Sequence, residues 1–151
     1  MKVFRLIAVV VVVVTLLAAW SSGASARATI KVTYVEHAIT DTVGDVAPAG
    51  DSVGDTLGFA NPVFDAQNTK QVGTDNGACW RTAVGKSWEC VWTLLLSDGQ
   101  ITVEGPFLDA GDSVLAITGG TGVYQTARGQ MTLHARDANG SAYDFAYEIM
   151  K

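Results

Sequence analysis

The stretch from Trp88 to Phe107, WECVWTLLLSDGQITVEGPF, constrains the fold of this chain more than any other. Two segments with alternating apolar residues flank Asp98-Gly99, a pair that supplies the positive φ angles of a type I′ turn. The sequence therefore predicts a β-hairpin with these two residues as its loop. That loop places Leu94 opposite Val103, so that one face is almost wholly apolar and the other is mixed. We take the apolar face as the side that points into the core.

A second hairpin is predicted directly before the first, in the segment CWRTAVGKSWEC. A turn near Val84-Gly85 places Cys79 directly opposite Cys90. The chain also carries an export signal, described next, and disulfides form in exported proteins. We therefore predict a Cys79–Cys90 disulfide; the alternative is two free thiols.

The first 26 residues are predicted to be a signal peptide, helical before cleavage and separate from the fold. Lys2 and Arg5 give a basic start, and residues 6–20 form an apolar run of 15 residues, which is shorter than the roughly 20 of a membrane span. Ala24-Ser25-Ala26 then matches an A-x-A cleavage signal. We expect one domain over residues 27–151 and a secreted protein; the alternative is an uncleaved single-span anchor.

The charge of the expected mature chain limits its partners. It has about 125 residues, the usual size of one domain. It keeps 8 basic side chains against 15 acidic ones, a net charge of −7 with histidine neutral. Such an acidic surface argues against nucleic acid and, after signal cleavage, against an anionic membrane as partners.

The pattern along the chain predicts an all-β domain. No long segment has helical periodicity, and short alternating segments follow one another at hairpin spacing. A closed antiparallel barrel of about eight strands would hide its edges and enclose side chains or one small ligand. A two-sheet sandwich is the alternative, but it usually needs longer crossings. The expected strands are 29–40, 56–64, 70–82, 88–97, 100–107, 113–118, 128–137 and 141–150, with a loop at 41–55 and a tight turn at Gly119–Gly122.

Glu36 is the sharpest candidate for a functional residue. Alternation places it on the same face as Ile30, Val32 and Tyr34, which is expected to be inside. A carboxylate inside an apolar barrel costs several kcal/mol unless it is paired or its pKa rises until it is neutral. The alternative is that Glu36 sits at the barrel mouth, bonded to solvent or to an arginine.

Several motifs, spread over most of the expected mature domain, resemble the allene oxide cyclase and dirigent barrel group. They are GDTLGFANPVFD (54–65), KQVGTDNGAC (70–79), SDGQITVEGPFLDAGDSVLAITGGTGVY (97–124) and RGQMTL (128–133), with GGTGVYQTARG (119–129) also similar to dirigent proteins. The resemblance implies an eight-stranded up-and-down barrel, often oligomeric, with a mostly hydrophobic cavity. It also implies two roles: cyclising an unstable allene oxide fatty-acid derivative, or steering the coupling of phenoxy radicals.

The same resemblance implies roles for individual residues. Glu36 in YVEHA matches the catalytic glutamate of the cyclases, and Asn61 in GFAN matches an asparagine that helps fix a water on the substrate epoxide. The chain departs from the pattern at Ala38, where the cyclases have a second asparagine. For Asn61 the alternative is a turn residue of an Asn-Pro pair that bonds its own backbone.

The predicted cavity wall combines strand parity with the resemblance. Phe59 matches a cavity aromatic of the cyclases, and Cys79 matches a cavity cysteine. The full set of predicted substrate-binding residues is Tyr34, Phe59, Trp92, Val103, Phe107 and Phe145. His37 and His134 are expected to face outward, and no metal-ligand spacing is present, so neither a metal nor a cofactor is predicted. Trp80 is also expected outside, where it would suit a homo-oligomer contact.

These observations favour an exported barrel that binds a hydrophobic small molecule. We expect it to steer or catalyse a cyclisation or isomerisation, with Glu36 as the acid or charge stabiliser and Asn61 as the orienting residue. The alternative is a non-catalytic secreted barrel that binds a ligand or a protein.

Overall fold

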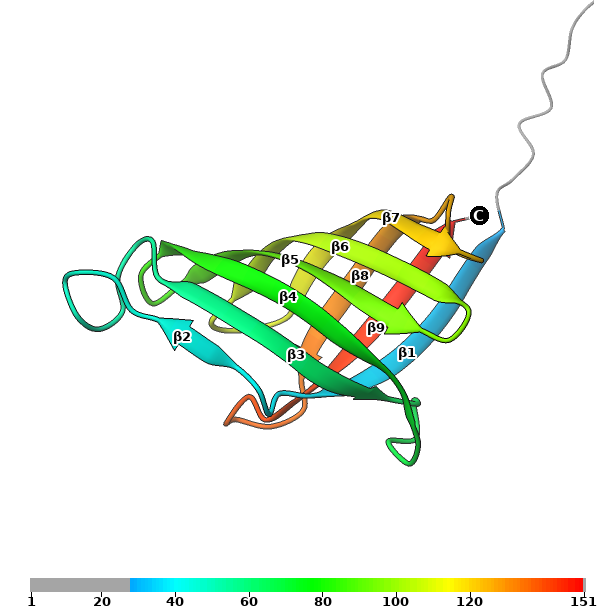
Figure 1. The fold of residues 1–151 in the computed structure, drawn as a ribbon, viewed down its shortest axis with the longest axis horizontal. Coiled ribbons are helices and arrows are strands. Elements are labelled where there is room, and N and C mark those ends of the chain that lie inside the picture. Colours follow the sequence, from blue (N-terminus) through cyan, green and yellow to red (C-terminus); the bar gives the residue numbers. More distant parts are fainter. Residues whose placement is uncertain (1–27, 151) are drawn as a thin grey trace, which may run out of the picture.

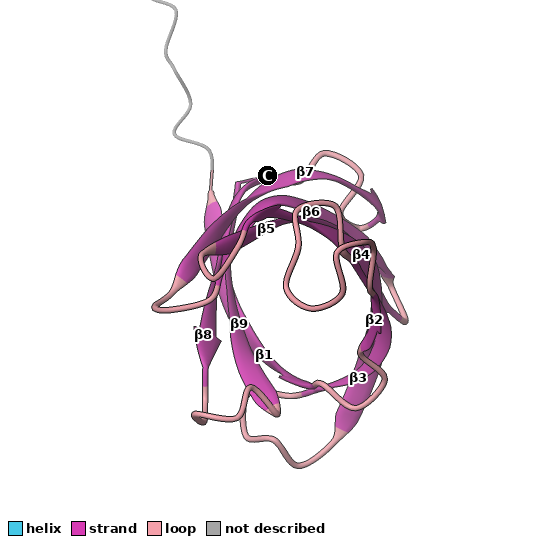
Figure 2. Cartoon of the chain, turned by 90° about the vertical axis from the view of Figure 1, so that its left-hand side faces the viewer, coloured by secondary structure: helices cyan, strands magenta, loops and turns pink. Residues whose placement is uncertain are grey.

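Antiparallel pairing of strands that follow one another in sequence builds this computed structural model, which describes residues 28–150. Each strand from β4 to β9 pairs with the strand before it, β1 pairs with β9, and β1 also pairs with β3, which closes the ring (Figure 2). The predicted all-β, eight-stranded antiparallel up-and-down barrel is confirmed. The strands are β1 (Thr29–His37), β2 (Thr42–Gly44), β3 (Thr56–Phe64), β4 (Gln71–Ala83), β5 (Ser87–Leu96), β6 (Gly99–Leu108), β7 (Ser113–Gly122), β8 (Arg128–Ala135) and β9 (Ala142–Met150).

The barrel closes over a short seam. β1 and β3 pair only through Val35 with Phe64 and Glu36 with Val63. The first half of β3 is therefore not paired with β1. β2 pairs with that half instead (Figure 1). β2 lies in segment 41–55, which the sequence had predicted to be a loop throughout.

The interior follows from alternation along each strand. On β5, for example, Trp88, Cys90, Trp92 and Leu94 point inward and are at most 8% exposed. The same alternation on the other strands gives one continuous apolar core, since closing the sheet leaves a single inner face. Its buried members also include Val63, Ile101, Val103, Leu115, Ile117, Met131, Leu133, Phe145, Tyr147 and Ile149.

The hairpin of β5 and β6 has the predicted faces but a different register. Leu94 pairs with Ile101 instead of its predicted partner, so the two-residue loop is Ser97-Asp98. The predicted type I′ turn is wrong, because among the described non-glycine residues only Asn68 has a positive φ. The turn is held from outside the hairpin: Val123 donates its backbone N–H to the Asp98 carbonyl oxygen at 3.1 Å. The register shift is two residues, which keeps every side chain on its predicted face.

The glycine-rich segment 119–122 was predicted to be a turn but continues β7, which pairs there with the start of β6. A Cβ atom at Gly120 would lie 2.5 Å from the carbonyl oxygen of Gln100, and one at Gly122 would lie 2.3 Å from that of Asp98. The glycines therefore allow the two backbones to approach, and they do not end the strand.

The hairpin of β4 and β5 forms as predicted. Cys79 pairs with Cys90 and the two form a disulfide, with their Cα atoms 4.0 Å apart. The predicted signal peptide helix and its cleavage site lie outside the described residues. N-terminal sequencing of the mature protein would test the cleavage site. Within residues 28–150 no helix is long and apolar enough to cross a membrane.

Gly77 on β4 lies between two aromatic side chains of the interior. It pairs with Phe59 of β3 on one side and with Trp92 of β5 on the other. A Cβ atom at this position would lie 2.4 Å from Cβ of Trp92 and 2.5 Å from Cζ of Phe59. Gly77 does not have a positive φ angle, so the lack of space for a side chain, and not the backbone conformation, requires glycine here.

We therefore expect Gly77→Ala to lower the free energy of unfolding by about 1–3 kcal/mol through overpacking. Gly58→Ala on the adjacent strand is the matched control, because its Cβ meets nothing within 4 Å. Its effect should stay within about 0.5 kcal/mol. Urea unfolding of both variants tests this, and equal losses in the two would contradict the assigned role of Gly77.

Candidate functional site

A cavity opens at the end of the barrel where β3, β5 and β9 begin and β4, β6 and β8 end. Including its open mouth, the hollow measures about 360 Å³, of which the centre of a water molecule can reach about 40 Å³. The space is therefore narrow, with room for a few waters when no ligand is bound. The lining residues are Glu36, Asp41, Leu57, Phe59, Cys79, Cys90, Trp92, Phe107, Leu133, Tyr143 and Phe145.

Aromatic side chains from four strands pack against one another in the cavity wall. The ring of Trp92 meets that of Phe59 edge-on, with centroids 6.0 Å apart, and lies 5.6 Å from that of Phe145. Nearer the mouth, Phe107 and Tyr143 form another edge-on pair at 5.9 Å. Each of these residues is at an inward position of its strand, so alternation alone brings them together.

The Asn61 side chain organises the polar end of the cavity. Its Nδ2 donates to Oε1 of Glu36 at 2.7 Å and to Oδ1 of Asp41 at 2.8 Å. Its Oδ1 accepts from the backbone N–H groups of Ile39 and Thr40 at 3.0 and 2.9 Å, and from the Thr40 hydroxyl at 2.9 Å. Because both amide hydrogens and the carbonyl oxygen are engaged, Asn61 holds Glu36 and the chain after β1 in place.

Asp75 is a second carboxyl group beside Glu36. It is fully buried on β4, directly opposite Asn61. Neither of its oxygens has a hydrogen-bond donor among the described residues. Two carboxylates can only accept, so a proton on one of them is needed to join the pair.

The environment favours that proton. Burial raises the pKa of both carboxyl groups, and the charge of Glu36 raises that of Asp75 further. A protonated Asp75 that donates to Glu36 lowers the pKa of Glu36, but burial outweighs this effect. Glu36 and Asp75 therefore form an acid pair that retains a proton at a pH where exposed carboxyl groups are ionised.

Two further buried polar atoms lie in this region. They are Nε1 of Trp92, which lines the cavity, and the hydroxyl oxygen of Tyr147, which is 1% exposed. Burial and the nearby Asp75 raise the pKa of Tyr147, so its hydroxyl stays protonated. A hydrogen bond between Trp92 and Tyr147 acts in the opposite direction on that pKa but is a smaller effect than burial, and it allows the two groups to satisfy each other.

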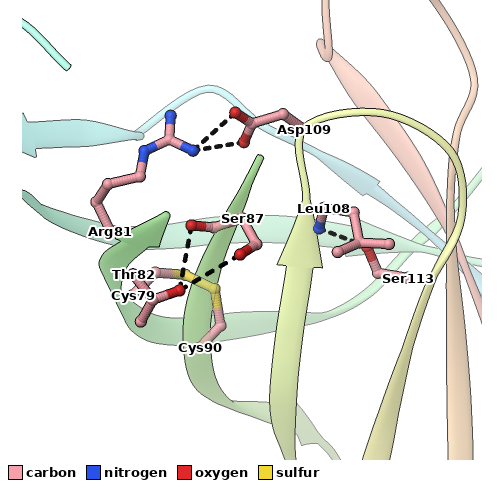
Figure 3. The surroundings of a disulfide bond; sticks show 8 residues. All are labelled: Cys79, Arg81, Thr82, Ser87, Cys90, Leu108, Asp109 and Ser113. Atoms are coloured by element: carbon pink, nitrogen blue, oxygen red, sulfur yellow. Dashed lines mark hydrogen bonds and ion pairs between the residues drawn. A yellow bond between two sulfur atoms is a disulfide. The ribbon is translucent and has the colours of Figure 1, made fainter. Parts of the chain in front are cut away.

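Arg81 lies at the same end of the barrel, two residues after the lining residue Cys79, and lines a separate hollow. Its Nη1 donates to both carboxylate oxygens of Asp109, at 2.6 and 2.7 Å (Figure 3). Its Nε lies 2.6 Å from Oδ1 of Asp51. The guanidinium group also stacks over Trp88, 4.2 Å from the ring centroid. Arg81 thus joins β4 to segment 41–55 and to the β6–β7 loop, next to the disulfide.

The structure brings most of the predicted site together. Among the predicted substrate-binding residues, Tyr34 and Val103 lie in the core but do not line the cavity, and the other four do: Phe59, Trp92, Phe107 and Phe145. Glu36 lines the cavity at 5% exposure and bonds Asn61, not an arginine, while Asn61 lies behind it. The disulfide cysteines Cys79 and Cys90 form part of the wall.

The residues predicted to face outward are at the surface in most cases. His134 pairs with Asp112 at 2.7 Å, and Trp80 is 48% exposed on β4. His37 is half-buried, bonds Asn68 at 2.8 Å and stacks on Phe64. No cluster of three or more potential metal-ligating side chains occurs among residues 28–150.

Sequence reasoning missed Asp75 and Asp41. The signal for Asp75 was available, since it has the same strand parity as Cys79, which had been placed inside. Asp41 carries no such signal, because it follows β1 in an irregular segment, where it lines the cavity and accepts from Asn61.

Comparison with known proteins supports the fold and the family. Residues 37–136 match the allene oxide cyclase family, and the match begins one residue after Glu36. A pyocyanin demethylase structure is similar with a TM-score of 0.67 and 25% identity, over 78% of this chain and 100% of that one. A pterocarpan synthase dirigent protein is similar with a TM-score of 0.66 and 17% identity, over 81% of this chain and 93% of that one. The Diels–Alderase AbmU from Streptomyces koyangensis is similar with a TM-score of 0.63 and 13% identity, over 85% of this chain and 71% of that one.

The acid pair predicts a pH dependence of stability. Because its folded-state pKa values lie above the unfolded value of about 4, the folded state binds more protons, and stability falls as pH rises above that value. As the pH rises from about 5 to about 8, the free energy of unfolding of the unsubstituted protein should fall. We expect that of Asp75→Asn to increase by about 1–3 kcal/mol relative to it over this range. Urea unfolding at several pH values measures this. The exposed Glu104→Gln is the control, and equal pH slopes for Asp75→Asn and the parent would refute the acid pair.

Proposed function

The chain belongs to the allene oxide cyclase family, and from that premise we propose that its barrel binds a hydrophobic small molecule and steers or catalyses its cyclisation or isomerisation. The observation that carries the proposal is the position of Glu36. Its carboxyl group lines an aromatic cavity, is almost fully buried, and lies beside a second acid that holds a proton. Perturbed acids in a concave apolar site are typical of acid–base chemistry.

Glu36 is the residue that would contact the reacting atoms. With its pKa raised by burial, it can give a proton to a ligand oxygen or, once ionised, stabilise positive charge that develops during cyclisation. Asp75, when it holds the shared proton, can pass it to Glu36 before Glu36 gives it to the ligand, and the pair is restored when the ligand gives up a proton later in the isomerisation. Asn61 acts as a positioning residue, since its amide hydrogens are already given to Glu36 and Asp41.

The aromatic wall supplies the second half of the proposed mechanism. A flexible substrate that enters a narrow space lined by Phe59, Trp92 and Phe145 is restricted to a few folded conformations. Such restriction lowers the entropic cost of joining two ends of one molecule. Because little of the space admits water, the reacting part would occupy the hollow and the remainder would extend through the mouth.

The narrowness of the cavity favours one other candidate function, a non-catalytic barrel that holds a ligand. In that case Glu36 would contact the ligand without changing it. The two candidates differ in whether the bound molecule is converted.

Native mass spectrometry of the protein with a hydrophobic metabolite extract would identify a bound molecule, and timed product analysis would follow its fate. We expect conversion by the parent protein and at least about a hundredfold loss of rate in Glu36→Gln, since general acid–base groups typically contribute this much. Asp75→Asn should shift the pH profile of the rate, and Glu104→Gln on the outer wall should change neither binding nor rate. Unchanged turnover by Glu36→Gln would exclude the proposed mechanism, and binding without conversion would favour the non-catalytic barrel.

A further inference from the structure

We infer that the cavity prefers planar, conjugated ligands that carry a positive charge, or develop one, and that it discriminates against carboxylates. This inference rests on the proposed function in one respect, namely that the ligand occupies this cavity. It adds the charge class of the ligand, which follows from the distribution of charged and aromatic groups around the hollow.

The charged side chains of the cavity lining are all acidic. Glu36 and Asp41 are the two, and no lysine, arginine or histidine lines the space within residues 28–150. An anionic ligand would lose hydration on entry and find no counter-ion, which is costly in a site of low dielectric constant. The net charge of −7 on the expected mature chain acts in the same direction at longer range.

The buried basic group at this end of the barrel is already paired with acids. Arg81 is the one basic residue among those described that is buried, at 8% exposure. Its guanidinium group is bound by Asp109 and Asp51 and covered on one face by Trp88. A ligand carboxylate that reached Arg81 would therefore meet a cation already paired with two anions.

The aromatic rings offer the complementary attraction. Phe59, Trp92, Phe107, Tyr143 and Phe145 account for about half of the lining residues. Aromatic ring faces attract cations, and the attraction reaches about 2 kcal/mol or more where both groups are desolvated. A flat conjugated ligand would use the same faces for stacking, so shape and charge favour the same class of molecule.

The polar groups at the floor of the cavity would also interact more favourably with a cation than with an anion. Glu36 and Asp41 both accept from Asn61, and the Asp75 oxygens lack any donor in the described chain. The hydroxyls of Tyr143 and Tyr147 also face this cluster, and burial together with the nearby carboxyl groups raises the pKa of each, so both remain neutral. A positive charge above Glu36 would therefore meet carboxyl groups without a competing cation.

Three two-ring probes of similar shape test the inference: N-methylquinolinium, methylnaphthalene and naphthoate, which are cationic, neutral and anionic. Equilibrium dialysis gives the affinity of each, and competition between them shows whether they share one site. We expect the cation to bind at least about tenfold more tightly than the neutral probe, and naphthoate at least about tenfold more weakly. Glu36→Gln should remove most of the cation's advantage, whereas Glu104→Gln, which deletes the same charge from the outer wall, should preserve it.

A measurement on the unsubstituted protein covers the case in which Glu36→Gln does not fold. Between about pH 6 and about pH 8 the affinity for N-methylquinolinium should rise as Glu36 ionises, and that for methylnaphthalene should stay constant. Methylnaphthalene or naphthoate binding as tightly as the cation would overturn the inference and leave the proposed function standing. Failure of all three probes to bind would overturn both.

Discussion

The barrel depends on how its first and third strands are joined. Only two residue pairs link β1 to β3, yet this seam closes the ring. Asn61 reinforces it from β3, by bonding Glu36 on β1 and the backbone of the two residues that follow Ala38. The amide is 1% exposed, so these bonds do not compete with water. The residue that secures the seam is therefore the one that fixes the orientation of the candidate acid.

The same closure creates an energetic conflict inside the barrel. It encloses Glu36 and Asp75 together, where two charges would repel each other and neither could be solvated. Sharing a proton relieves the repulsion, because the pair then carries one negative charge where two free carboxyl groups would carry two. A folded domain does not need such a pair, since apolar residues of similar size would pack there at lower cost. Retention of strained polar groups in an otherwise apolar interior is typical of sites that bind or react.

Much of the fold could be predicted because strand alternation has a strict period of two. The inward placement of Glu36, Trp92 and Cys90 follows from parity alone, and the hairpin turn of β4 and β5 correctly set Cys79 opposite Cys90. The register of β5 with β6 could not be read from the hairpin, because β7 binds the Asp98 carbonyl and changes the turn. The run Gly119–Gly122 was misread for a related reason: its glycines serve a close approach of β7 to β6 that only the closed barrel reveals.

The candidate site was predictable only in part. Its aromatic wall was found by parity together with the family resemblance, but Tyr34 and Val103 fell outside the cavity because the barrel axis separates inward positions into layers. Asp75 had the right parity and was overlooked between two glycines. Asp41 lines the cavity from the segment after β1 and is held there by Asn61. Contacts of this kind, made by loops across the barrel end, leave no periodic trace in a sequence.

The most direct test of the shared proton is an NMR titration of the side-chain carboxyl carbons in protein labelled at glutamate and aspartate. Glu36 and Asp75 are predicted to titrate at higher pH than ordinary carboxyl groups, and Asp75 should move to lower pH in Glu36→Gln, since the Glu36 charge raises its pKa. If both carboxyl groups titrate with the exposed acids, near the ordinary value of about 4, the cavity contains no acid pair. The mechanism proposed for this barrel would then be wrong.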